Sequence, residues 1–305
     1  MKKQLFIINP SAGKGGRRLK KTLALIREFA ETLPEKNEVY ITKSSEEARE
    51  KIRSDASEHE SLAVYACGGD GTLNSCINAA AGLANTAVTN FPCGTGNDFI
   101  KTFGKENFSR FSSLSSLLRG TVYPMDIIKC NGQFGINICS VGFDARIGAD
   151  VHKYSKIPLI GGAAGYVVSL ISNTIKGVAE KFHILSSAGE FDGEYTLVCA
   201  CNGRYYGGGF NPIPDASPFD GRIDYLLVEG IPRRKVAGLV MKYASGRYRE
   251  LGGIAARVNG GELTISADKE FCVNIDGEII MTSRAEFSVQ AGGVNFILPE
   301  GVDPF

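Results

Sequence analysis

Long apolar runs, paired cysteines and metal-binding histidines are all missing from this sequence. No uninterrupted apolar stretch approaches the roughly 20 residues that a membrane-spanning helix needs. The eight cysteines form no Cys-x-x-Cys pair, and several stand in apolar, strand-like segments. We therefore interpret them as reduced core thiols of a cytosolic protein and not as a disulfide or zinc framework. The histidines, His59, His152 and His183, have no metal-ligand spacing.

Charge of one sign is also lacking, since the formal net charge is +1. This excludes the global basic field that nucleic-acid binding would suggest. Met1–Gln4 leads directly into a predicted strand, so we expect no signal peptide and a cytoplasmic location. A length of 305 residues with 43% hydrophobic residues indicates a globular chain of two domains.

A unit of strand, glycine-rich loop and helix recurs three times before residue 100. The predicted strands 5–8, 62–67 and 86–91 end in the loops 9–16, 68–74 and 92–99. A helix over 18–33, a strand over 39–42 and a helix from Ser45 lie between them. This rhythm predicts a parallel sheet whose loops converge on one edge, where ligands bind in such folds. The first loop is not a Walker A motif, because no Ser or Thr follows its Gly-Lys at the required spacing.

The loop Cys67–Asn74 has the composition of a phosphate site. Its glycines allow close approach of the backbone and positive φ, and the N–H groups that open the next helix favour a phosphate. Asp70 would repel that anion unless a divalent cation lies between them. A sharp strand–helix turn with an Asp cap is the alternative interpretation.

The pattern changes after Thr121. Asn131-Gly132 is a strong hairpin signal between the predicted strands 125–129 and 133–140. Further strands are expected at 182–187, 195–202, 223–228, 263–266, 271–275, 287–290 and 294–298, with helical segments over 144–175 and 235–244. A half so rich in strands predicts a sandwich or distorted barrel.

Together these motifs resemble the diacylglycerol kinase catalytic family, in its bacterial soluble lipid-kinase branch, which is related to the sphingosine kinases. The motifs are Asn9-Pro10-x-x-Gly13, Gly68-Gly69-Asp70-Gly71-Thr72 with Asn74, Gly94-Thr95-Gly96-Asn97-Asp98-Phe99, Asp126, Asp220-Gly221 and Asp276-Gly277-Glu278. The resemblance implies a phosphofructokinase-like three-layer α/β domain over 1–124, completed by about 290–305. It also implies a β-sandwich lipid-substrate domain over 125–289, with the active site in the interdomain cleft.

The resemblance assigns roles to particular residues. It implies ATP contacts at Asn9, Pro10, Ser11, Ala12, Gly13, Thr42, Gly68, Gly69, Asp70, Gly71, Thr72, Leu73, Asn74 and Thr95. It also implies that Asp70, Asp98 and Asp126 hold a catalytic Mg²⁺ through water. The family's general base lies in Asp276-Gly277-Glu278, where we expect either Asp276 or Glu278 to act, although Asp-Gly is also a good hairpin turn.

A structural Mg²⁺ site is implied at Asp220, with the backbone carbonyl groups of Ser217 and Arg222. Phe219 stands where a second acidic residue is often found, and a plain turn is the alternative.

We expect an ATP-dependent kinase that phosphorylates a lipid hydroxyl, most simply that of diacylglycerol, giving phosphatidic acid. Its partner would be the lipid at the inner membrane surface, with peripheral contact only, no nucleic acid, and a homodimer left open. The apolar segment 157–172 is either a membrane contact or a buried, closely packed helix. An NAD kinase-like phosphotransferase and a non-catalytic lipid-binding regulator are the alternative functions.

Overall fold

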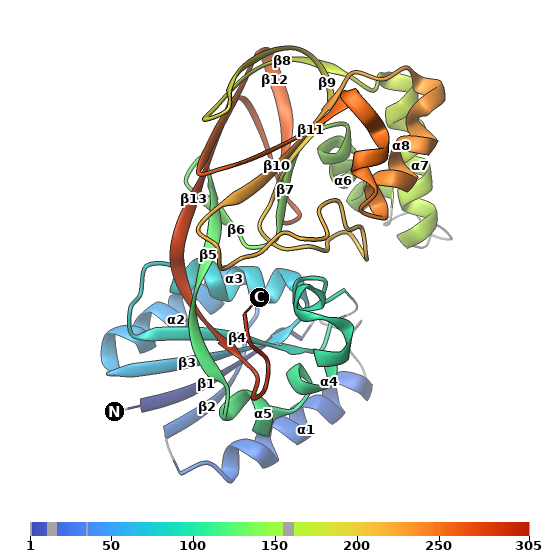
Figure 1. Ribbon diagram of the computed structural model, residues 1–305. Coiled ribbons are helices and arrows are strands. Elements are labelled where there is room, and N and C mark those ends of the chain that lie inside the picture. Colours follow the sequence, from blue (N-terminus) through green and yellow to red (C-terminus); the bar gives the residue numbers. More distant parts are fainter. Residues whose placement is uncertain (1, 11–16, 35, 95, 155–161, 305) are drawn as a thin grey trace. The chain divides into compact units, whose positions relative to one another are not determined.

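The computed structural model describes residues 2–10, 17–34, 36–94, 96–154 and 162–304 (Figure 1). Two compact units divide the chain. The first unit comprises Met1–Ile127 and Ala291–Phe305, and the second unit comprises Ile128–Gln290. Two strands, β5 (Thr121–Cys130) and β13 (Glu278–Leu298), have residues in both units, and each unit is described by itself below.

A parallel sheet forms the centre of the first unit. Its strands are β1 (Lys2–Ile8), β2 (Lys36–Ile41), β3 (Ser61–Gly68) and β4 (Thr86–Pro92). They lie in the order β2-β1-β3-β4, and every pairing is parallel. The run Leu5–Ile8 is at most 1% exposed, as its continuous apolar character predicts for a strand covered on both faces.

Helices cover both faces of this sheet and make a three-layer unit. The helices are α1 (Arg17–Glu31), α2 (Ser45–Glu58), α3 (Asp70–Ala80), α4 (Phe108–Phe111) and α5 (Leu114–Leu118). In Figure 1, α2 and α3 lie together on one face, and α1 lies on the other. The predicted alternation of strands and helices is confirmed.

The last part of β13 extends the same sheet. Asn295 and Phe296 pair with Ala87 and Val88 of β4, in parallel. The Thr89 hydroxyl donates to the Ile297 carbonyl over 2.8 Å. Phe296 is fully buried, and its ring contacts those of Phe99 and Phe103 from the segment that follows β4. The end of the chain therefore forms part of the first unit's core.

Antiparallel strands build the second unit. They are β6 (Gln133–Gly135), β7 (Ile138–Gly142), β8 (Glu180–Ser186), β9 (Gly189–Cys201), β10 (Ile223–Glu229), β11 (Ala255–Gly260), β12 (Glu262–Ile275) and the first part of β13. The pairings β7-β9, β9-β8, β8-β12 and β12-β7 close a ring around an apolar core. This agrees with the predicted sandwich or barrel. Asn131 and Gly132, with φ of 45° and 84°, form the predicted two-residue turn.

Two helical segments pack outside this sheet. The first contains α6 (Phe143–Tyr154) and α7 (Gly162–Lys176), and the second is α8 (Val236–Ala244). A second apolar cluster lies between the sheet, α6 and α8. Among the described residues, the structure contains no helix that is long and apolar enough to cross a membrane.

Two predicted strand breaks are wrong. Residues 263–275 form one strand, in which the register shifts between Ser266 and Phe271. Residues 287–298 belong to β13, which continues through Gly292 at φ 57°. Polar or glycine residues at these points resemble turns in sequence, but here they mark irregularities within long strands.

Candidate functional site

In the loops after β3 and β4, Gly68 and Gly94 are required for space and not for unusual dihedral angles. Gly69 has φ −100°, and Gly68 and Gly71 also lie outside the left-handed region, so the expected positive φ is wrong. A Cβ on Gly68 would collide with the Thr72 side chain. A Cβ on Gly94 would lie 2.5 Å from the Cα of Gly69. The loops after β3 and β4 therefore touch through their main chains.

Substitution of Gly94 tests this contact. Gly94→Ala forces the two main chains apart, because the new Cβ would lie 2.7 Å from the Gly69 nitrogen as well as close to its Cα. We expect it to lower the free energy of unfolding by about 1–3 kcal/mol. Gly71→Ala is the matched control, since its Cβ meets nothing within 4 Å. Equal melting temperatures for the two variants would contradict the close approach.

Asp70 joins the same two loops through its carboxylate. It is the first residue of α3, and its oxygens accept the N–H groups of Asp98, over 2.9 Å, and Phe99, over 3.0 Å. Burial raises the pKa of Asp70, and the Asp98 carboxylate raises it further, whereas the two N–H groups lower it. A Cβ on Gly96 would lie 2.8 Å from Asp70 Oδ2. Asp70 is thus a half-buried acid clamped between two glycine loops.

The other two predicted magnesium residues are buried carboxylates with partners. Asp98 forms an ion pair with Lys101, and Asp126 accepts the N–H of Gly292 over 2.8 Å. In the described part of the chain, the groups of three or more ligand atoms within 4.8 Å are Asp55/Glu58/His59 and His183/Glu190/Asp192. Asp70, Asp98 and Asp126 are not such a group, so together they do not surround one ion directly. Carboxylates set back from the metal suit Mg²⁺, which usually keeps several waters.

A polar pocket of about 190 Å³ opens in the first unit where β1 and β2 end and α2 and α3 begin. Its lining consists of Asn9, Thr42, Lys43, Ser44, Ser45, Ala48, Thr72 and Ser75. The Asn9 amide donates to the Thr72 hydroxyl over 3.1 Å. Of the predicted nucleotide contacts, the structure therefore brings Asn9, Thr42 and Thr72 together.

The remaining predicted nucleotide residues have different positions. Ser11, Ala12, Gly13 and Thr95 lie outside the described residues, and Pro10 is exposed at the end of β1. Leu73 is fully buried, so only its main chain could meet a ligand. Asn74 is buried within α3 and accepts the Asn78 amide over 2.8 Å.

Sequence reasoning missed the contribution of Lys43, Ser44 and Ser45 to this pocket. The Ser44 hydroxyl caps α2 by accepting the Glu47 N–H over 3.1 Å, and the Glu47 carboxylate accepts the Lys43 N–H over 2.5 Å. The Ser-x-x-Glu spacing of Ser44 and Glu47 is a sequence signal that indicates the start of this helix. A strand end joined to a helix start is the signal that identified the other loops, so it could have identified this one.

In the second unit, Asp276 and Glu278 flank the turn between β12 and β13. Asp276 has φ 49°, and its carboxylate accepts three consecutive N–H groups, from Ile136 at 2.5 Å, Asn137 at 3.2 Å and Ile138 at 2.9 Å. The Glu278 side chain is exposed at the start of β13. The two acids therefore have different surroundings. Main-chain N–H groups bind the Asp276 carboxylate, whereas the Glu278 side chain is exposed to solvent.

The predicted structural metal site is a turn. The Asp220 carboxylate accepts the Arg222 N–H over 3.0 Å, and the Ser217 hydroxyl accepts the Phe219 N–H over 3.4 Å. Gly221 follows Asp220 with φ 73°. These bonds account for the fold of the segment, and a metal at Asp220 stays a prediction.

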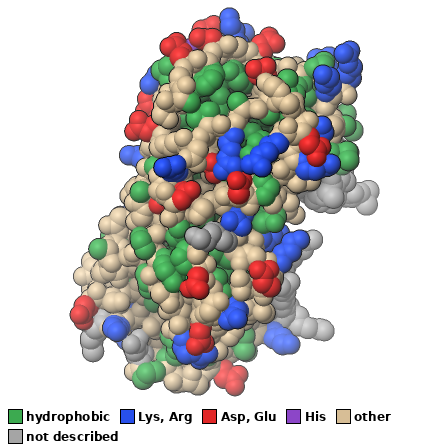
Figure 2. All heavy atoms as spheres, viewed as in Figure 1, with side chains coloured by type: hydrophobic (Ala, Val, Ile, Leu, Met, Phe, Trp, Pro, Cys, Tyr) green, Lys and Arg blue, Asp and Glu red, His purple; other side chains and the backbone are tan. Residues whose placement is uncertain are grey.

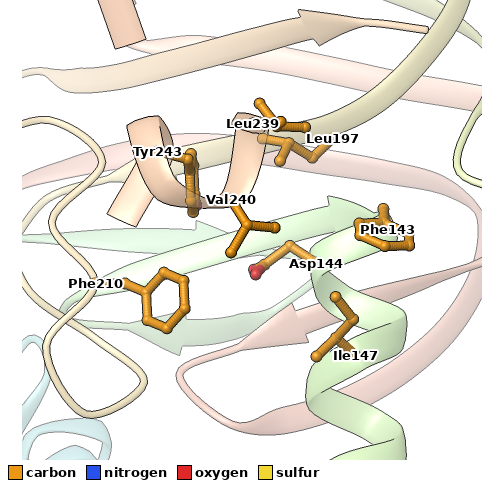
Figure 3. A pocket seen from close by; sticks show the side chains of 8 residues that line it. All are labelled: Phe143, Asp144, Ile147, Leu197, Phe210, Leu239, Val240 and Tyr243. Carbon is orange, nitrogen blue, oxygen red and sulfur yellow. The ribbon is translucent and has the colours of Figure 1, made fainter. Parts of the chain in front are cut away.

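A small pocket in the second unit lies between α6, β9 and α8 (Figure 3). Asp144 points into it among apolar side chains such as Phe143, Phe210 and Val240. Burial raises the pKa of the Asp144 carboxyl. The volume, about 10 Å³, accommodates about one water molecule. We therefore assign no larger ligand to this pocket.

Comparison with known proteins gives a consistent result along the chain. Residues 3–130 match the diacylglycerol kinase catalytic domain, and residues 137–298 match the YegS C-terminal NAD kinase beta sandwich-like domain. A "Probable lipid kinase YegS-like" of Pseudomonas aeruginosa is 29% identical over 78% of this chain and 77% of that protein. A protein of the same description from Shewanella frigidimarina is 27% identical over 76% of this chain and 75% of its own length.

A solved structure has the same fold. The crystal structure described as that of a diacylglycerol kinase from Bacillus anthracis has a TM-score of 0.72 and 24% identity, and the match covers 99% of this chain and 98% of that one. The three-layer α/β unit and the β-sandwich unit therefore correspond to a known two-domain architecture. The chain belongs to the diacylglycerol kinase-like family of lipid kinases, in its YegS-like branch.

Proposed function

We propose that this protein transfers the γ-phosphate of ATP to a hydroxyl group of a lipid, with diacylglycerol as acceptor and phosphatidic acid as product. The observation that carries the proposal is the carboxylate of Asp70, which ties two main-chain glycine loops together at the carboxyl ends of parallel strands. Phosphoryl transfer requires positioning and charge neutralisation far more than covalent work by the protein. In this proposal, the loops after β3 and β4 position the phosphates of ATP, and their main-chain N–H groups help to neutralise the phosphate charge.

The polar pocket of the first unit is the proposed site for the phosphates of ATP. Hydroxyl and amide groups of Asn9, Thr42 and Thr72 line it, and the N-termini of α2 and α3 begin beside it. The first N–H groups of a helix have no partner within the helix, and the helix dipole adds positive potential there. An anionic phosphate chain suits this lining better than an apolar ligand does.

Mg²⁺ is the proposed metal, held through water by Asp70, Asp98 and Asp126. All three are oxygen donors of the kind that Mg²⁺ prefers, and a Mg²⁺ ion that keeps several waters does not need direct contact with each of them. When bound, the ion would neutralise charge on the phosphate oxygens. Lys101 already balances the charge of Asp98.

We assign the general base to Glu278 and a positioning role to Asp276. Three main-chain N–H groups already occupy the oxygens of the Asp276 carboxylate, so these oxygens are less accessible to a substrate hydroxyl. They also fix the loop between β6 and β7 to the β12–β13 turn. The exposed Glu278 carboxylate is free to accept the proton of the lipid hydroxyl.

Incubation of the protein with γ-labelled ATP, Mg²⁺ and a total lipid extract tests the proposal, with mass spectrometry of the products. We expect a phosphorylated lipid, and phosphatidic acid when diacylglycerol is supplied alone. A parallel reaction with NAD as acceptor should give no product. Labelled NADP would support the NAD kinase alternative, and absence of transfer to any lipid would support a non-catalytic regulator.

A further inference from the structure

Over residues 167–176 of helix α7, two polar side chains are buried and a row of apolar side chains is exposed, although Leu170 packs against the apolar cluster. Its polar residues Ser169 and Asn173 are 0% and 1% exposed. Its apolar residues Val167, Ile171 and Ile175 are 51%, 55% and 69% exposed. The spacing of four residues places these three side chains in one row along the helix. A helix on the surface of a soluble protein ordinarily turns its apolar stripe inward.

Contacts with α6 explain why the polar side faces inward. The Ser169 hydroxyl donates to the Ile147 carbonyl over 2.9 Å. The Asn173 amide donates to the Asp150 carboxylate over 3.0 Å, and Lys176 pairs with the same carboxylate at 3.1 Å. These bonds fix the rotation of α7 about its axis, so the exposure of the apolar row follows from the packing.

Basic residues adjoin this row. The Arg233 guanidinium donates to the Ile175 carbonyl over 2.8 Å, which joins the end of α7 to the segment before α8. Arg234 and Lys235 follow and are exposed. Residues 230–248 contain no Asp or Glu and include Arg233, Arg234, Lys235, Lys242 and Arg247. Lys242 and Arg247 pair with Glu250, at 3.9 Å and 3.6 Å, so the positive charge of this segment comes from Arg233, Arg234 and Lys235. On α8, Met241 is 65% exposed.

We define the α7–α8 surface as Val167, Val168, Ile171, Ile175 and Met241 with Lys176, Arg233, Arg234 and Lys235. The bond from Arg233 to Ile175 joins the end of α7 to the segment that leads into α8, and both helices lie in the same part of the second unit in Figure 1. In that part of Figure 2, hydrophobic and basic side chains are visible, with acidic ones near them. Scattered single apolar residues need no explanation, but a row along one helix beside a basic segment indicates an interaction site.

We propose that the α7–α8 surface docks on the surface of an anionic lipid bilayer. Apolar side chains would enter the boundary between head groups and acyl chains, and the basic residues would meet anionic head groups. The positive charge next to the row favours an anionic bilayer over a second copy of this chain, whose own surface would carry the same charge. The inference rests on the proposed function only in that a bilayer holds the lipid acceptor.

Sedimentation with lipid vesicles tests this docking. The vesicles contain phosphatidylcholine alone or phosphatidylcholine mixed with phosphatidylglycerol, and the full chain is used. We expect tighter binding to the anionic vesicles. The double variant Ile171→Glu/Ile175→Glu should lower the partition coefficient at least tenfold on both, because two apolar anchors are lost. Arg234→Glu/Lys235→Glu should lower it about twentyfold or more on the anionic vesicles alone.

Leu25→Glu is the matched control, since Leu25 is 51% exposed on α1 of the first unit. It should bind both kinds of vesicle as the unaltered protein does, and circular dichroism checks that each variant is folded. Absence of binding by the unaltered protein, or equal losses in control and test variants, would overturn the proposal. So would light scattering that shows a dimer lost with Ile171→Glu/Ile175→Glu, because the surface would then bind a second copy.

The two proposals can fail separately. Vesicle binding without transfer of phosphate to any lipid would retain the docking surface and contradict the proposed function. Transfer of phosphate to a detergent-dispersed acceptor without vesicle binding would support the proposed function and contradict the docking surface.

Discussion

Glu278→Gln is expected to reduce phosphoryl transfer to the lipid hydroxyl by about 10²–10⁴-fold and to leave ATP affinity unchanged. Glutamine has nearly the shape of glutamate but cannot accept the hydroxyl proton. Glu278 belongs to the second unit, whereas the polar pocket proposed for ATP lies in the first. Initial rates with diacylglycerol and calorimetric titration with ATP measure the two quantities separately.

Two companion variants show whether the effect is specific to Glu278. Glu270→Gln removes another exposed carboxylate from the same unit and should have full activity. Asp276→Asn should lower the melting temperature as well as the rate, because one of its oxygens no longer accepts main-chain N–H groups. Full turnover by Glu278→Gln together with a folded, inactive Asp276→Asn would transfer the role of base to Asp276.

Asp70→Asn is expected to reduce the rate by about 10²–10³-fold, the range found when one preorganised electrostatic group is lost. Asparagine can still accept one of the two N–H groups that Asp70 accepts from Asp98 and Phe99. The lost bond destabilises the loop, but burial already raises the pKa of Asp70 and disfavours its charge, so removal of that charge offsets the loss. We therefore expect a melting temperature close to that of the unaltered protein.

The Mg²⁺ dependence of the rate distinguishes a metal-holding role from a purely structural one. If Asp70 helps to hold the ion through water, Asp70→Asn should need a higher Mg²⁺ concentration for half-maximal rate. Asp303→Asn is the control, because Asp303 is an exposed carboxylate of the same unit that accepts the Tyr123 hydroxyl, over 3.3 Å. An unchanged rate for Asp70→Asn would refute the magnesium assignment.

The sequence predicts the architecture well where the pattern is local. Continuous apolar runs such as Leu5–Ile8 identify buried parallel strands, and Asn131-Gly132 identifies its hairpin. The sequence predicts long strands poorly. The register shift after Ser266 and the positive φ of Gly292 interrupt two strands at residues whose composition is typical of turns. Only pairing with distant strands shows that the chain continues extended there.

In the candidate site, too, the sequence predicts local features well and contacts between distant segments poorly. The glycine loops and their acids can be identified from motifs, but the reason for the glycines cannot. A Cβ on Gly94 is excluded by Gly69, which lies 25 residues earlier in the chain, and such a contact leaves no local signal. The different surroundings of Asp276 and Glu278 also depend on a distant segment, the main chain of 136–138.

The pairing of β13 with β4 affects how the chain acquires its structure during synthesis. Residues 295 and 296 of β13 pair with β4, and the strands on the other side of β4, which are β3, β1 and β2, all lie before residue 69. A ribosome adds about 5–20 residues per second, so roughly 10–40 seconds pass between the synthesis of β4 and that of the β13 residues that pair with it. Until then the apolar contacts of Phe99 and Phe103 with Phe296 are unmade. The nascent first unit is therefore exposed to chaperones and to aggregation for longer than a domain of contiguous sequence would be.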